Sequence, residues 1–164
     1  MTTSLVRTRH AVANDVPAVR ALHERCSPDA LHRRFHVPTT RVSPGFVEQL
    51  VLPRRGWSLV AEQCGEVVGH GCAGELTPSQ VEVGLLVEDA QQGSGIGSRL
   101  LRDIAAEASA RGYRSLVCLA QADNESVLPT IHRAGLRAAS TLDDGLLEIV
   151  VPLPAVEQPL QRPA

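Results

Sequence analysis

Residues 83–101, VGLLVEDAQQGSGIGSRLL, combine an apolar segment, a glycine loop and the start of an amphipathic segment, and this combination is the most informative part of the sequence. The apolar run Val83–Val87 is typical of a buried strand. After the loop Gln92–Gly97, the apolar residues share one helical face until Gly112 stops the pattern. A helix N-terminus presents unpaired N–H groups and partial positive charge, so this arrangement favours an anionic ligand such as a phosphate.

Several kinds of glycine loop bind phosphates, and the sequence separates them. A Walker A loop needs a lysine after its last glycine, but all 16 basic residues are arginines. A dinucleotide fingerprint belongs in an early βαβ unit, with an acidic residue about 20 positions further on. Here the loop lies in the middle of the chain and follows strands of antiparallel type. A glycine-rich turn without a ligand remains the structural alternative.

The patterns on both sides of this segment predict alternating groups of helices and strands. Upstream we expect a strand, then three helical stretches introduced by Asp15, Ser27 and Ser43, then a hairpin around Gln63-Cys64-Gly65. Downstream we expect a strand, a short helix ended by Gly135 and a final strand. The predicted strands are Val6–Ala11, Trp57–Glu62, Glu66–Cys72, Val81–Val87, Ser115–Ala120 and Leu146–Val151, and the predicted helices after the hairpin are Gly97–Arg111 and Asn124–Ala134.

The motif Gln92-x-x-Gly95-x-Gly97 resembles the pyrophosphate loop of the GNAT acetyltransferases. A second element, Asn124 followed by Gly135 eleven residues later, resembles another motif of that family, with Leu136 in place of the usual Phe. The resemblance implies an α/β (α+β) fold: a GNAT-like mixed, largely antiparallel twisted sheet of six to seven strands with about four helices. We expect this domain to span residues 1–153 and residues 154–164 to form a loose tail.

The resemblance also implies acetyl-CoA as cosubstrate and a set of residues that bind it. The amides of Gln92–Gly97 would hold the pyrophosphate, and the backbone of Leu85–Val87 would pair with the pantetheine. An amide near Leu86 or Val87 would stabilise the oxyanion, provided that a strand bulge leaves it unpaired. The full expected binding set is Leu85, Leu86, Val87, Gln92, Gly93, Ser94, Gly95, Ile96, Gly97, Ser98 and Asn124.

Glu82 is the expected catalytic residue, because it is a carboxylate inside the otherwise apolar run Val81–Val87. A Glu at this place acts as general base in bacterial protein lysine acetyltransferases, which this region resembles. We expect burial to raise the pKa of Glu82 towards neutrality. The alternative is a strand-edge Glu that faces water. Where many relatives carry a tyrosine acid this chain has Ile131, and the adjacent His132 would point elsewhere on its helix.

The stretch Ser27–Phe35 resembles a segment of the same lysine acetyltransferases, with His32 in place of a Tyr, so Arg33, Arg34 and Phe35 are expected to shape the acceptor site. The predicted function is acetyl transfer to a primary amine, with a protein lysine favoured as acceptor. Two alternatives stay open: a small-molecule amine as acceptor, and a noncatalytic acyl-CoA-binding domain.

Composition limits the remaining possibilities. The net charge is −2 and no Arg run exceeds two residues, so neither a nucleic acid nor a membrane is an expected partner. Cys72 and Cys118 lie in apolar segments and read as inert core residues, and His70 reads as core or surface. His23, His32 and His36 lack metal-ligand spacing, so we expect no metal. A cytoplasmic location is expected, and a monomer and a homodimer both remain open.

Overall fold

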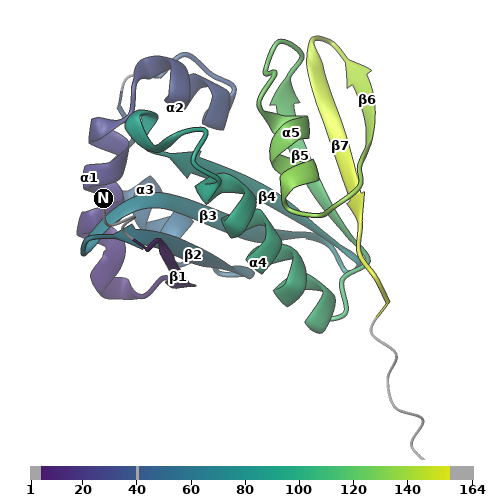
Figure 1. Cartoon of the computed structure of the whole chain (residues 1–164), viewed down its shortest axis with the longest axis horizontal. Coiled ribbons are helices and arrows are strands. Elements are labelled where there is room, and N and C mark those ends of the chain that lie inside the picture. The colour runs from purple at the N-terminus through teal and green to yellow at the C-terminus, as the bar shows by residue number, and fades with distance from the viewer. Residues whose placement is uncertain (1–4, 40, 156–164) are drawn as a thin grey trace, which may run out of the picture.

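The computed structural model describes residues 5–39 and 41–155 of the 164-residue chain. These residues form seven strands and five α-helices (Figure 1). The predicted fold class is therefore confirmed, with one helix more than expected. In chain order the elements are β1 (Arg7–His10), α1 (Val16–Arg25), α2 (Pro28–Phe35), α3 (Pro44–Val51), β2 (Gly56–Gln63), β3 (Glu66–Thr77), β4 (Gln80–Val87), α4 (Ile96–Ala110), β5 (Ser115–Gln121), α5 (Val127–Arg133), β6 (Ala139–Asp143) and β7 (Leu146–Pro152).

Local sequence signals explain where the early helices begin. The Ser27 hydroxyl accepts a hydrogen bond from the Ala30 amide at 3.2 Å and so caps α2. The Ser43 hydroxyl does the same for α3 by accepting from the Phe46 amide at 3.3 Å. Such caps satisfy N–H groups that have no partner within the helix. Asp15 precedes α1 as expected, but its carboxylate does not cap that helix.

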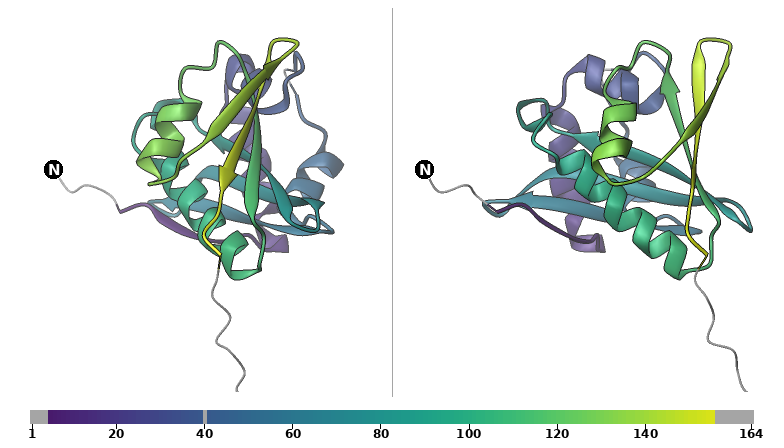
Figure 2. Two further views of the ribbon diagram at one scale, coloured as in Figure 1. Left: turned by 90° about the vertical axis from the view of Figure 1, so that its right-hand side faces the viewer. Right: turned by 45° about the vertical axis from the view of Figure 1, so that its right-hand side comes forward.

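All strands belong to one sheet in the order β1-β2-β3-β4-β5-β7-β6, and only β4 and β5 run parallel. Their pairing covers Gln80–Glu82 opposite Ser115–Val117 and then stops. Beyond Glu82 the two strands separate, so the β5-β7-β6 part of the sheet rises away from the β1–β4 part (Figure 2). The sheet is therefore open at its centre, along the edge of β4 that follows Glu82.

The helices cover the two faces of the sheet separately. Helix α4 packs on one face, where its fully buried residues include Leu100 and Ile104. A Cβ atom at Gly71 of β3 would lie 2.9 Å from the Ile104 Cδ1 atom, so the glycine allows this close approach. Helices α1, α2 and α3 enclose a second apolar cluster on the opposite face, which includes Leu86 of β4. Alternate residues of β3 and β4 therefore contact different helices.

Asp15 holds the side chain of Arg9, which lies on the first strand. Its two carboxylate oxygens each accept a hydrogen bond from the Arg9 guanidinium at 2.7 Å, and one also accepts from the Val12 amide at 2.8 Å. Arg9 also pairs with Glu62 of β2. The hydrogen bonds from Arg9 outweigh burial and lower the pKa of Asp15. Asp15 is 6% exposed, so the loss of its charge would leave Arg9 with Glu62 as its one remaining anionic partner among the described residues.

We expect Asp15→Asn to reduce the free energy of unfolding at pH 7 by roughly 2 to 4 kcal/mol. Because the folded-state pKa is lowered, the carboxylate stabilises the fold above its unfolded pKa near 3.9, and this contribution is lost as pH falls through the lower folded value. The variant should lack this acid-dependent loss. Denaturant titrations between pH 7 and pH 3 measure both effects. Asp29→Asn is the control, because the loss of its exposed ion pair with Arg33 should change the free energy of unfolding by less than about 1 kcal/mol. Equal stability of Asp15→Asn and the wild type would contradict the assignment.

Most of the expected C-terminal tail, from residue 156 onward, lies outside the described residues. Within them, the Ser109 hydroxyl donates to the Pro154 carbonyl at 2.9 Å. None of the helices in the described ranges combines the length and the apolar character that crossing a membrane requires.

Candidate active site

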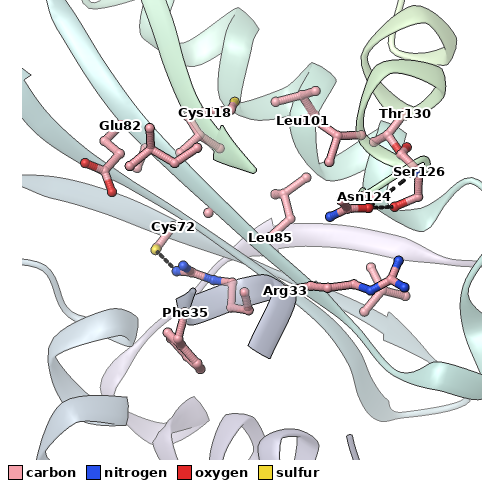
Figure 3. A pocket seen from close by; sticks show the side chains of 18 of the residues that line it. Arg33, Phe35, Cys72, Glu82, Leu85, Leu101, Cys118, Asn124, Ser126 and Thr130 are labelled. Atoms are coloured by element: carbon pink, nitrogen blue, oxygen red, sulfur yellow. Dashed lines mark hydrogen bonds between the residues drawn. The ribbon is translucent and has the colours of Figure 1, made fainter. Parts of the chain in front are cut away.

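A cavity of about 670 Å³ lies where β4 and β5 separate. It is bordered by the open edge of β4, the loop before α4, the start of α5 and the end of α2. Figure 3 shows Glu82 at one end of this cavity, with Asn124 and Ser126 at the other. The glycine loop and the expected catalytic carboxylate therefore share one cavity, although nine residues lie between Glu82 and Gln92 in the sequence.

The loop before α4 presents a row of free amides. Gly95 adopts a φ of +91°, which glycine reaches without strain, and the helix begins at the next residue. Among the described residues, the amides of Gly95, Ile96, Gly97 and Ser98 donate to no protein group, whereas the Arg99 amide donates to the Gly95 carbonyl at 3.0 Å. Four N–H groups thus meet the positive end of a 15-residue helix, which suits a pyrophosphate.

Two residues of the expected binding loop, Gln92 and Ser94, use their backbone amides in hydrogen bonds within the protein. The Gln92 amide donates to the Asp89 carbonyl at 3.3 Å, and its side-chain nitrogen donates to the Val87 carbonyl at 3.2 Å. The Ser94 amide donates to the Gln91 carbonyl at 3.4 Å, and Ser94 does not line the cavity. Gln92 therefore ties the loop to the end of β4. The amides that remain for a ligand are the one of Gly93 and those of Gly95–Ser98.

The loop is also tied to helix α2. Asp89 accepts hydrogen bonds from the Ser27 amide at 2.9 Å and from the Ser27 hydroxyl at 2.5 Å. Burial alone raises the pKa of Asp89, but these hydrogen bonds lower it to a value below the usual range. A charged Asp89 therefore joins the N-terminus of α2 to the glycine loop.

The edge of β4 supplies the second set of backbone groups. Leu85 and Val87 line the cavity, whereas Leu86 points away and is buried against α1–α3. The bulge expected near Leu86 and Val87 is absent, because both pair regularly with β3 and the register shift falls at Glu75/Thr77. Free amides arise instead where β5 leaves β4, since alternate N–H groups of a strand face each side.

Helix α5 begins three residues later than predicted. The Asn124 side-chain oxygen accepts hydrogen bonds from the Ser126 amide at 3.3 Å and from the Ser126 hydroxyl at 2.7 Å, and the helix starts at Val127. Asn124 thus initiates the turn into the helix and lines the cavity across from Leu85 (Figure 3). Thr130 of α5, which the sequence analysis missed, also borders the cavity.

Among the residues that the structure describes, two carboxylates line the cavity, Glu75 and Glu82. Glu75 is engaged, because it pairs with Arg55 at 2.5 Å and accepts a hydrogen bond from the Tyr113 hydroxyl at 3.1 Å. The Glu82 carboxylate makes no hydrogen bond or ion pair with any described residue. The expected burial of Glu82 is wrong: its side chain is exposed, because it projects from β4 opposite Gly74, which has no side chain to cover it.

The remaining side chains divide into cavity residues and core residues. Cys72 and Cys118 are half-buried and line the cavity, and Cys118 also packs against the main apolar core as expected. Burial raises the pKa of Cys118 to about 12, which keeps its thiol protonated. His70 is 1% exposed, and burial followed by the charge of Arg34 lowers its pKa to about 3. His70 is thus a neutral core residue, and His132 is exposed on the surface.

His36 is a cavity residue whose chemistry the sequence did not reveal. It ends α2 with a left-handed φ of 60°, and its buried Nδ1 atom has no hydrogen-bond partner in the described chain. Burial, followed by the charge of Arg34, lowers its pKa, so the imidazole is neutral near pH 7. It is therefore a second group in the cavity that can accept a proton. No group of three or more His, Cys, Asp or Glu residues in the described ranges could hold a metal ion.

Ile131 is both a wall of the cavity and a core residue, with 1% of its surface exposed. We expect Ile131→Tyr to lower the free energy of unfolding by about 1 to 3 kcal/mol, because the larger ring must displace its core neighbours. Thermal denaturation measures the loss, and Ile131→Val, which removes one methyl group, is the reference for a change without overpacking. A variant as stable as the wild type would show that the ring extends into the cavity without strain.

The geometry agrees with comparisons to known proteins. Residues 16–136 match the model of the Acetyltransferase (GNAT) family. Similar solved structures include the GNAT domain of S. lividans PAT, with 25% identity, a TM-score of 0.82 and 90% of each chain covered. Another is yncA of Salmonella typhimurium, solved with its cofactor acetyl-CoA, with 22% identity, a TM-score of 0.71 and 93% of this chain and 95% of that one covered.

A third similar structure is the ribosomal-protein-alanine N-acetyltransferase of Brucella melitensis, with 24% identity, a TM-score of 0.71 and coverage of 90% of this chain and 99% of that one. No match was found among curated proteins. The family match covers well over half of the chain, and the chain therefore belongs to the GNAT acetyltransferase family. It is therefore an acetyltransferase of the GNAT type.

Proposed function

We propose that this protein transfers the acetyl group of acetyl-CoA directly to a primary amine, with a protein lysine as the favoured acceptor. The observation that carries the proposal is the shared cavity: four free amides at the start of α4 border it at one side, and the unpaired Glu82 carboxylate lies at its far end. A cosubstrate held by the loop and along the edge of β4 would place its thioester between these two features.

In this proposal the chain performs three tasks. Glu82 accepts the proton of the attacking ammonium, whose pKa is about 10 for lysine. The amine nitrogen bonds to the thioester carbon, and a free amide of β4 stabilises the resulting oxyanion. The carbon–sulfur bond then breaks, the CoA thiolate leaves, and the second proton of the nitrogen passes to this thiolate directly or through water. Because a thiolate is a tolerable leaving group, the missing tyrosine at Ile131 does not prevent turnover.

A protein lysine is favoured because of helix α2. Its sequence, Ser27–Phe35, resembles a segment of bacterial protein lysine acetyltransferases, and its last residues, Arg34 and Phe35, line the cavity near Glu82's strand. The marked similarity to the GNAT domain of S. lividans PAT extends over 90% of both chains and is consistent with this choice.

The test is to incubate the protein with acetyl-CoA and a panel of small amines and lysine peptides while a thiol-reactive dye records CoA release. We expect amine-dependent thiol release and a mass increase of one acetyl group on the acceptor. CoA binding with no amine-dependent thiol release would instead support the noncatalytic acyl-CoA-binding alternative.

A further inference from the structure

Arg34 is a cation in the cavity wall that no acidic residue in the described part of the chain neutralises through an ion pair. Its guanidinium donates one hydrogen bond, to the Cys72 sulfur at 3.0 Å, and lies 5.0 Å from the centre of the Phe35 ring. Six other arginines pair with carboxylates, and these are Arg9, Arg20, Arg25, Arg33, Arg55 and Arg111. Within the described residues Arg34 has no such partner, so most of its donors are available to a ligand.

The sheet is shaped to receive this guanidinium. A Cβ atom at Gly84 would lie 2.2 Å from the Arg34 Cζ atom, so the guanidinium occupies the space that a side chain on β4 would fill. Cys72 of β3 is the direct neighbour of Gly84 and accepts the hydrogen bond drawn in Figure 3. The guanidinium is therefore held in one place on the cavity floor.

The position of Arg34 also separates it from the pyrophosphate loop. Gly84 and Glu82 lie on the same face of β4, two residues or about 7 Å apart. Figure 3 shows Cys72 at the Glu82 end of the cavity, away from Asn124 and Ser126. The neighbouring imidazoles of His36 and His70 add no positive charge, because burial and then Arg34 itself lower both of their pKa values.

We infer that the acceptor carries a carboxylate close to its reactive amine, and that Arg34 binds this carboxylate. The inference rests on the proposed function and narrows its substrate class. The Arg34 guanidinium over Gly84 and the Glu82 carboxylate form a pair of opposite charges along β4, which complements an acceptor whose ammonium and carboxylate lie close together in space. A guanidinium fork binds a carboxylate through two parallel hydrogen bonds, which a neutral amide cannot replace. The carboxylate can belong to a free amino acid or to an acidic residue beside a lysine.

The experiment compares acceptors that differ only in this carboxylate. One arm uses a lysine peptide with Asp next to the lysine against the same peptide with Asn, and the other uses free lysine against lysine amide. We expect the wild type to prefer the carboxylate form by about 10- to 100-fold in kcat/KM in at least one arm, which identifies the source. Arg34→Gln should abolish this preference through the acceptor's KM, with the KM for acetyl-CoA unchanged.

Two further variants separate binding from folding. Gly84→Ala keeps the arginine but displaces its guanidinium, so this variant should also lose the preference for the carboxylate form. It should remain folded, because only the end of a flexible side chain has to move. Arg20→Gln removes the same charge from an exposed pair on α1 outside the cavity and should behave as the wild type. Thermal denaturation checks that each variant is folded.

Each contrary result has a distinct meaning. Equal rates for both members of each pair in the wild type would overturn the inference and leave amine acetylation intact. A rise in the KM for acetyl-CoA in Arg34→Gln, with the acceptor preference kept, would assign Arg34 to the cosubstrate and overturn it as well. No acetylation of any amine would refute the proposed function itself, and the inference with it.

Discussion

Gly95→Asp should weaken CoA binding by at least about 100-fold while the protein remains folded. The new carboxylate would stand at the start of α4, among the free amides of Gly95, Ile96 and Gly97. A unit charge about 4 Å from a phosphate costs on the order of 4 kcal/mol near a protein surface, and the acid would also compete for the amides. Isothermal titration calorimetry with CoA measures the effect.

The matched control is Gly95→Asn, which has nearly the same shape but no charge. A Cβ atom at Gly95 meets no protein atom within 4 Å, so the added bulk is tolerated by the fold. The φ of +91° strains any other residue, although Asn reaches left-handed conformations more readily than most. Asn should therefore bind CoA more tightly than Asp, and the difference isolates charge from backbone strain. Undiminished affinity in Gly95→Asp would show that the pyrophosphate binds elsewhere.

The features that the sequence predicted well depend on local interactions. The loop and the helix after it could be predicted because glycines, a helix start and an apolar stripe follow one another within about 20 residues. The serine caps of α2 and α3 were equally readable, since Ser27 and Ser43 bond to amides three residues away. In each case the partners are close in the chain, so the pattern and the interaction coincide.

The features that the sequence did not predict depend on contacts between distant segments or belong to strands whose side chains are exposed. Strand β6 was not located because all five of its residues are exposed, so no apolar alternation marks it. The Asp15 carboxylate was expected to cap α1, but it accepts hydrogen bonds from Arg9 on β1 instead. The free state of Glu82 depends on Gly74 opposite and on where β5 leaves the sheet. No spacing along the chain encodes these relations.

The packing of Arg34 against Gly84 is the clearest example of a contact that the sequence does not reveal. A glycine within an apolar strand weakens the strand unless another group needs its space. The sequence shows the glycine, but only the packing of α2 on β4 shows that a guanidinium from 50 residues away occupies that space. The sequence placed Arg34 near the acceptor site, but the seat of its guanidinium on β4 could not be predicted, whereas the glycine loop and its helix follow from a single stretch.

Glu82→Gln should lower turnover by roughly 10² to 10⁴ while CoA affinity stays nearly the same. Glutamine keeps the shape and the hydrogen-bonding reach of the side chain but cannot accept the proton of an ammonium. Glu82 has no protein partner, so its substitution disturbs no ion pair within the described residues. The deficit should shrink at high pH, where more of the amine is already neutral. Steady-state rates across pH 6 to 10, about the range over which a lysine amine deprotonates, measure both effects.

Glu75→Gln is the control for this prediction, because it removes the other cavity carboxylate. Glu75 is occupied by Arg55 and Tyr113, so its loss should affect stability more than chemistry. His36→Gln tests the second proton acceptor in the same cavity. If Glu82→Gln turned over like the wild type near pH 7 while His36→Gln lost activity, the base would be the imidazole, whose lowered pKa keeps it neutral at that pH. If only Glu82→Gln loses activity, and the loss fades as the amine deprotonates, the carboxylate on β4 is the group that receives the proton.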